Sequence, residues 1–144
     1  IQFSTLLHDG QPMKDKLTED LALTNFDRAD IVIASNKTFI LDDGRFTIIG
    51  KKHKKLFSKE LFELSDSIEE DNYRYSSILK TNEQEAWIFY NEKLLIFNHK
   101  TNKIQKVIDL GTWQPHRVVA DGNRLWLINR EDGKLYGVEI EEGS

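Results

Sequence analysis

Short apolar runs of β-forming residues alternate with polar turns along most of this chain. Three apolar runs, at residues 37–41, 85–89 and 124–128, are each followed by a polar turn and a second apolar run, at residues 45–49, 94–97 and 134–138. The turns are rich in Asp, Asn and Gly, which tolerate the left-handed backbone of tight hairpin turns. Because the runs are short and bounded by such turns, the pattern predicts three β-hairpins rather than helices.

Further runs flank each hairpin and extend it into a larger unit. The predicted strands lie at residues 30–34, 37–41, 45–49 and 55–62 in the first unit, at 76–80, 85–90, 93–97 and 103–110 in the second, and at 117–120, 124–128 and 134–140 in the third. A period of roughly 40 to 50 residues with about four strands per unit lies in the range of β-propeller blades. The middle strands are continuously apolar, whereas residues 103–110 alternate. This difference is expected where neighbouring blades cover both faces of the middle strands.

We therefore expect an all-β, β-propeller-like fold of about three four-stranded antiparallel blades, at residues 29–75, 76–112 and 113–144. The third unit lacks a fourth strand, and the N-terminal segment 1–28 is the candidate to supply it, through residues 1–7. Propeller rings have roughly four to eight blades, so a three-blade arc leaves two blade faces to cover. Either a homodimer or the remainder of a longer propeller would cover them.

The last part of the chain carries the most specific repeat. Residues 121–128 read Asp-Gly-Asn-Arg-Leu-Trp-Leu-Ile, and residues 132–139 read Asp-Gly-Lys-Leu-Tyr-Gly-Val-Glu. This pairing of an aromatic-rich strand with an Asp-Gly-Lys-Leu-Tyr return resembles the blades of quinoprotein-like and two-component-regulator-type β-propellers. The resemblance begins at Ala29 and implies blade geometry. It implies no catalytic residue and no cofactor, since the motifs carry no chemistry and no residues match a quinone-cofactor pocket. Trp87 and Trp126 occupy equivalent repeat positions, which predicts core packing for both.

Composition removes several classes of function. A formal net charge of -4 and a pI of about 5.6 argue against a dedicated nucleic-acid binder. The chain has no cysteine, and its four histidines are isolated from one another, so we expect no metal site. The apolar runs fall far short of the roughly 20 residues that cross a bilayer. We expect a soluble chain without a signal or anchor, in either a cytoplasmic or an extracytoplasmic location.

The connection between the second and third units contains the first candidate site. It reads Gly-Thr-Trp-Gln-Pro-His at residues 111–116. In the propellers that this chain resembles, such a connection opens onto the mouth of the central channel, where ligands commonly bind. Trp113 and His116 are therefore candidate ligand contacts. The alternative for Trp113 is a structural role, folded onto the edge of a blade.

The equivalent connection one unit earlier, residues 63–75, is long and acidic. Its candidate binding residues are Asp66, Glu69, Glu70, Tyr73 and Arg74. Long loops on a rigid scaffold commonly carry binding sites, although a solvated acidic loop is the simpler interpretation. Residues 66–71 contain no glycine and no alternating ligand register, so they do not form a standard calcium loop.

These observations favour a non-catalytic interaction or sensing module. Its partner would be a protein, a peptide or a small-molecule ligand, bound through loops at the channel mouth. The alternative is a hydrolase or lyase that combines His116 with the carboxylates of residues 66–71 at the centre of the ring. A third hypothesis gives the lysine-rich residues 51–55 an anionic partner, in place of a solvated hairpin tip.

Overall fold

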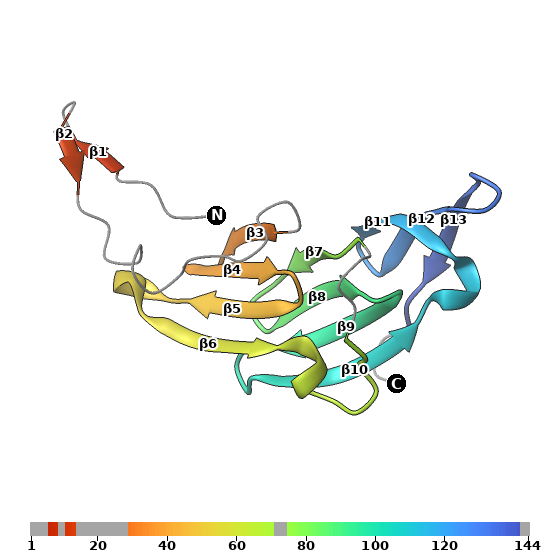
Figure 1. Cartoon of the computed structure of the whole chain (residues 1–144), viewed down its shortest axis with the longest axis horizontal. Coiled ribbons are helices and arrows are strands. Elements are labelled where there is room, and N and C mark those ends of the chain that lie inside the picture. The colour runs from red at the N-terminus through yellow and green to blue at the C-terminus, as the bar shows by residue number, and fades with distance from the viewer. Residues whose placement is uncertain (1–5, 9–10, 14–28, 71–74, 142–144) are drawn as a thin grey trace.

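The computed structural model of the chain is all-β and describes residues 6–8, 11–13, 29–70 and 75–141. Every strand pairing in it is antiparallel (Figure 1). The first sheet contains β3 (Ala29–Ala34), β4 (Lys37–Asp42), β5 (Arg45–Ile49) and β6 (Lys55–Glu60). The second contains β7 (Ser77–Thr81), β8 (Glu85–Tyr90), β9 (Lys93–Asn98) and β10 (Lys103–Asp109). The third contains β11 (Pro115–Asp121), β12 (Arg124–Asn129) and β13 (Leu135–Glu139).

Short 3₁₀ turns lie between some of these strands. They are η2 (Lys51–His53), η3 (Leu61–Glu63) and η4 (Gly111–Trp113). The all-β prediction is confirmed, and the predicted strands match the observed ones closely. One boundary differs in a way that affects the site, because β11 begins at Pro115 and therefore includes His116, which we expected in a loop.

The N-terminal segment forms a separate pairing in its described part. Strand β1 (Leu6–His8) pairs with β2 (Gln11–Met13) in a two-stranded sheet. Among the described residues the third sheet consists of β11, β12 and β13 without a strand from this segment. Most of residues 1–28 lie outside the described part of the chain, so their closing role stays a prediction.

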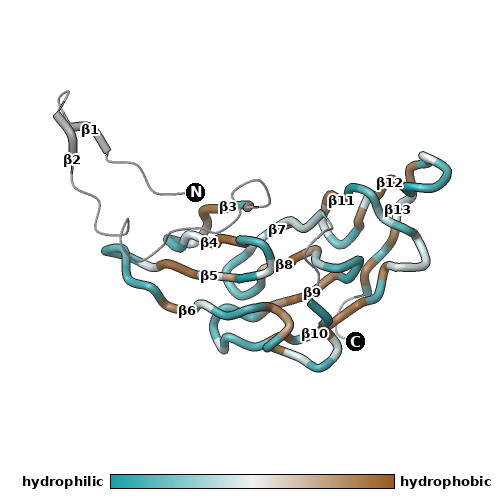
Figure 2. Tube along the Cα trace, in the orientation of Figure 1, coloured by the Kyte–Doolittle hydropathy of each residue, from teal (hydrophilic) through white to brown (hydrophobic). Residues whose placement is uncertain are grey.

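The second sheet is buried on both faces. On β8, Ala86 and Ile88 pack in one apolar cluster with Phe39 and Phe46 of the first sheet. The residues that alternate with them point to the other face. Trp87 and Phe89 pack there with residues of the third sheet, among them Val118, Leu125 and Leu127. Figure 2 shows the apolar positions running along these central strands. This two-sided burial explains the continuous apolar runs of β8 and β9, since both faces need apolar side chains.

The first strands of the three sheets lie along one side of the structure. Strand β7 contacts both β3 and β11, and the sheets fan outward from these strands as an open arc (Figure 1). The carboxylate of Asp30 in β3 accepts hydrogen bonds from the Ile78 backbone N–H at 2.8 Å and from the Ser77 hydroxyl at 3.1 Å. The Lys80 ammonium of β7 donates to the Gly122 carbonyl at 2.6 Å. Polar bonds therefore tie neighbouring sheets together beside the apolar clusters.

A buried histidine, His99, joins the first and second sheets at the end where β4 begins and β9 finishes. The His99 Nε2 atom lies 2.8 Å from the Asn82 carbonyl, which can only accept, so this nitrogen carries the proton. The Nδ1 atom then accepts from the Lys37 ammonium, 3.1 Å away. Burial lowers the pKa of His99 below its usual range, and the charges of Lys37 and Lys100 lower it further. The neutral ring is therefore the form that fits this contact.

Candidate functional site

Hairpin turns and inter-sheet connections gather at one end of the stacked sheets, which we call the connection end. The Leu61 N–H, at the start of the connection that follows β6, donates to the Gly44 carbonyl in the β4–β5 turn at 2.8 Å. The Asn91 side-chain amide in the β8–β9 turn donates to the Glu69 carbonyl at 3.2 Å. These two hydrogen bonds, one between backbone groups and one from a side chain to the backbone, hold the acidic connection and the turns together at the same end.

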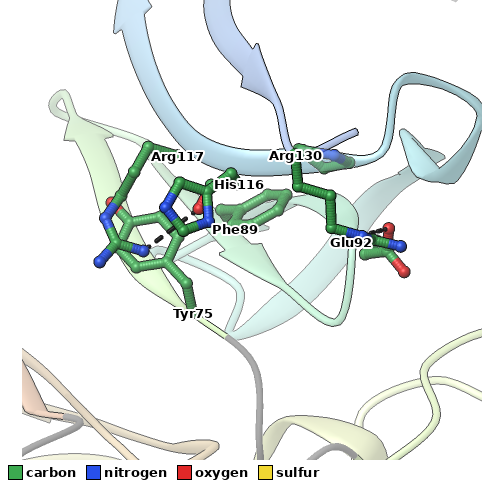
Figure 3. Close-up of a pocket in the computed structure, with 7 residues that line it drawn as sticks. Tyr75, Phe89, Glu92, His116, Arg117 and Arg130 are labelled. Carbon is green, nitrogen blue, oxygen red and sulfur yellow. Dashed lines mark hydrogen bonds and ion pairs between the residues drawn. The ribbon is translucent and has the colours of Figure 1, made fainter. Parts of the chain in front are cut away.

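A pocket of about 400 Å³ opens at the connection end between the second and third sheets (Figure 3). The residues that line it come from the segment just before β7, from β8 and the turn after it, from the start of β11, and from the position just after β12. They are Tyr75, Phe89, Glu92, Pro115, His116, Arg117 and Arg130. Figure 3 shows Arg117 and Arg130 on opposite sides of His116. The pocket therefore presents two cations, one imidazole and one carboxylate beside apolar side chains.

Arg117 is held by a ring and a carbonyl. Its guanidinium lies over the Tyr75 ring, with the guanidinium carbon 4.3 Å from the ring centroid. Its Nη1 atom donates to the His116 carbonyl at 3.2 Å. The Tyr75 ring in turn packs against Phe89, whose centroid is 5.8 Å away. Because Phe89 is only 1% exposed, this stack is anchored in the core between the sheets.

Arg130 has a different environment, because it forms an ion pair. Its Nη1 atom lies 2.9 Å from Glu92 Oε2, with side-chain exposures of 43% for Arg130 and 18% for Glu92. The Arg130 backbone N–H also donates to the Gln114 carbonyl at 2.9 Å. The pair therefore bridges the β8–β9 turn of the second sheet and the end of β12 in the third.

The two residues that we singled out in the 111–116 connection take different positions. His116 lines the pocket and is exposed. Trp113 is half-buried against Tyr136, with ring centroids 5.6 Å apart, and its carbonyl accepts from the Asn129 side-chain amide at 2.9 Å. Trp113 is thus packed at the edge of the third sheet and is not among the residues that line the pocket.

The acidic candidates do not line the pocket either. Asp66, Glu69 and Glu70 are exposed, and Glu69 reaches the site only indirectly, through the bond from Asn91 to its carbonyl. Tyr73 and Arg74 lie outside the described residues.

Sequence reasoning missed five of the polar and aromatic residues at the pocket, namely Tyr75, Phe89, Glu92, Arg117 and Arg130. A signal for two of them was available. Glu92 and Arg130 occupy hairpin turns of consecutive units that open at the same end, and they carry opposite charges. Stacked repeats bring such turns close together, so an ion pair could have been expected there.

Within residues 6–8, 11–13, 29–70 and 75–141, no group of three or more His, Asp or Glu side chains could hold a metal ion. No helix in that part of the chain is long and apolar enough to cross a membrane. In comparisons with known proteins, no family model matches the chain, and no curated protein matches it.

Proposed function

We propose that this chain is part of a β-propeller and acts as a non-catalytic binding module, whose ligand occupies the pocket at the connection end. The observation that carries the proposal is the pocket itself. It is lined from two consecutive sheets, and it contains polar groups that converge on an apolar wall.

The register of the sheets supports the propeller assignment. Trp87 pairs with Ile96 in the second sheet, and Trp126 pairs with Gly137 at the equivalent place in the third. Phe39 holds the same position in the first sheet, where it packs toward the second. Each sheet thus uses the same face to contact the next one, as stacked blades do.

The third sheet repeats this face without a described sheet to cover it. Val119, Ile128 and Leu135 lie on the outer side and are 60%, 40% and 63% exposed. Ile128 pairs with Leu135 in the third sheet, as Phe89 pairs with Leu94 at the equivalent place in the second. Phe89 and Leu94 are both buried, whereas Ile128 and Leu135 are exposed. The face is therefore suited to a further blade, from a second copy of the chain or from the remainder of a longer propeller.

A hydrolase or lyase built on His116 receives less support. General acid–base catalysis by an imidazole gains from a partner group that orients the ring. Within the described part of the chain, the His116 side chain forms no hydrogen bond to a carboxylate, and Glu92, the carboxylate that lines the pocket, is paired with Arg130. Binding is the activity that this arrangement favours.

The test is a ligand screen followed by proton–nitrogen correlation NMR, with small neutral, acidic and basic compounds as probes. We expect at least one probe to shift the backbone signals of Glu92, His116 and Arg117 together. His116→Ala should weaken that binding, whereas the matched change His53→Ala should not, since His53 lies in η2 at the opposite end of the first sheet. Shifts confined to residues 51–55, or to no common location, would contradict the proposal.

A further inference from the structure

We infer that the pocket recognises its ligand through one carboxylate group, held by Arg117, with an apolar group of the ligand beside it. The inference rests on the proposed function and specifies the chemical class of the ligand.

The Arg117 side chain is already held by neighbouring groups, and several of its N–H donors have no partner among the described residues. A guanidinium offers five N–H groups in a planar fork that matches a carboxylate. The Tyr75 ring lies under the Arg117 guanidinium, and one hydrogen bond to the His116 carbonyl restrains the side chain further. Among the described residues no carboxylate contacts Arg117, so its remaining donors are free for a ligand. A donor group that is already ordered loses little side-chain entropy on binding.

The neighbouring cation is already neutralised. Glu92 forms an ion pair with Arg130 at 2.9 Å and is largely shielded from solvent. Counting histidine as neutral, the charged groups that line the pocket among the described residues, Arg117, Arg130 and Glu92, have a net charge of +1. The whole chain has a net charge of -4, so the pocket differs in sign from the protein around it. A monoanion matches this charge, whereas a dianionic phosphate would leave one negative charge unmatched.

The apolar residues that line the pocket indicate which chemical group of the ligand lies beside its carboxylate. Tyr75, Phe89 and Pro115 form the apolar wall beside Arg117 and His116, and Tyr75 is the most accessible of the three, since Phe89 is 1% exposed and Pro115 is buried. A ligand with an aromatic or aliphatic group next to its carboxylate would contact the wall and the guanidinium at once. N-acetyl-L-phenylalanine has both features, and its amide replaces the carboxylate with a neutral carboxamide of similar shape.

The experiment measures dissociation constants of N-acetyl-L-phenylalanine, its amide and phenyl phosphate by calorimetry, with the bound site located by NMR. We expect the acid to bind more tightly than the amide or the phosphate. Arg117→Gln should weaken binding of the acid roughly ten- to a hundredfold, because a charge-assisted hydrogen bond is lost. Arg117→Lys should weaken binding of the acid less than Arg117→Gln does, because lysine keeps the positive charge although it lacks the planar fork of donors. Arg124→Gln is the matched control, since Arg124 is paired with Glu139 at the far end of β12.

The outcomes separate this inference from the proposed function. If the amide shifts the pocket signals as strongly as the acid, and Arg117→Gln has no effect, the pocket binds ligands but the carboxylate assignment is wrong. Tighter binding of phenyl phosphate would also overturn the assignment. If none of the three probes binds the pocket, the inference is wrong as well, and the broader screen then decides whether the pocket binds any ligand.

Discussion

Replacing Trp87 with alanine should destabilise the fold much more than replacing Trp126, although the two tryptophans hold equivalent positions in β8 and β12. Trp87 is 4% exposed and packs between the second and third sheets. Trp→Ala at such a buried site typically costs about 3–5 kcal/mol in free energy of unfolding. The Lys80 ammonium, 3.8 Å from the Trp87 ring centroid, adds a contact that the variant also loses. Trp126 is only half-buried and lies on the outer face over Gly137, so its loss should cost about 1–2 kcal/mol.

The assay is urea unfolding of both variants and the unaltered chain, followed by circular dichroism. It should be run at a concentration where light scattering gives the mass of one 16.8 kDa chain. At higher concentration the cost of Trp126→Ala should rise if a second copy covers the outer face, because association then contributes to stability. Equal costs for the two variants in the monomer, or a cost below about 1 kcal/mol for Trp87→Ala, would refute the two-sided burial of the second sheet.

Three other predictions follow from polar contacts. Asp30→Ala should lower the free energy of unfolding by about 1–3 kcal/mol, measured in urea, because it leaves hydrogen-bond donors of β7 unpaired. Burial lowers the pKa of His99, so the unfolded chain binds a proton there more readily, and stability should fall as pH drops below about 6.5. His99→Gln should flatten that dependence in urea unfolding at several pH values, whereas His53→Gln should leave it intact. The Asp132 carboxylate accepts from the Tyr136 hydroxyl at 2.8 Å and raises the pKa of that tyrosine. Asp132→Asn should return the Tyr136 ultraviolet titration to an ordinary tyrosine range, and an unchanged titration curve would contradict the assigned bond.

The strands could be predicted because their signals are local. Residues 86–90 form a continuous apolar run, and β8 (Glu85–Tyr90) begins only one residue before it. Where a local signal was ambiguous, the predicted boundary of the strand differs from the observed one. Pro115 resembles a loop residue in the sequence, yet it begins β11, a position where proline is tolerated because it need not donate to the ladder.

The pocket could not be predicted in the same way, because it depends on how the sheets stack. Glu92 and Arg130 are 38 residues apart, and they meet only because consecutive sheets place their hairpin turns at one end. The stacking of Arg117 on Tyr75 likewise joins two sheets. His116 was found because it occupies the connection itself, whereas Trp113, equally conspicuous in the sequence, packs against Tyr136.

The main proposal is that the pocket between the second and third sheets binds a ligand that carries a carboxylate beside an apolar group. The most direct measurement is a set of intermolecular nuclear Overhauser effects between N-acetyl-L-phenylalanine and the protein. We expect contacts from the aromatic protons of the ligand to the side chains of Tyr75 and Pro115, which line the pocket. Contacts confined to the lysine-rich residues 51–55, at the opposite end of the first sheet, would contradict it.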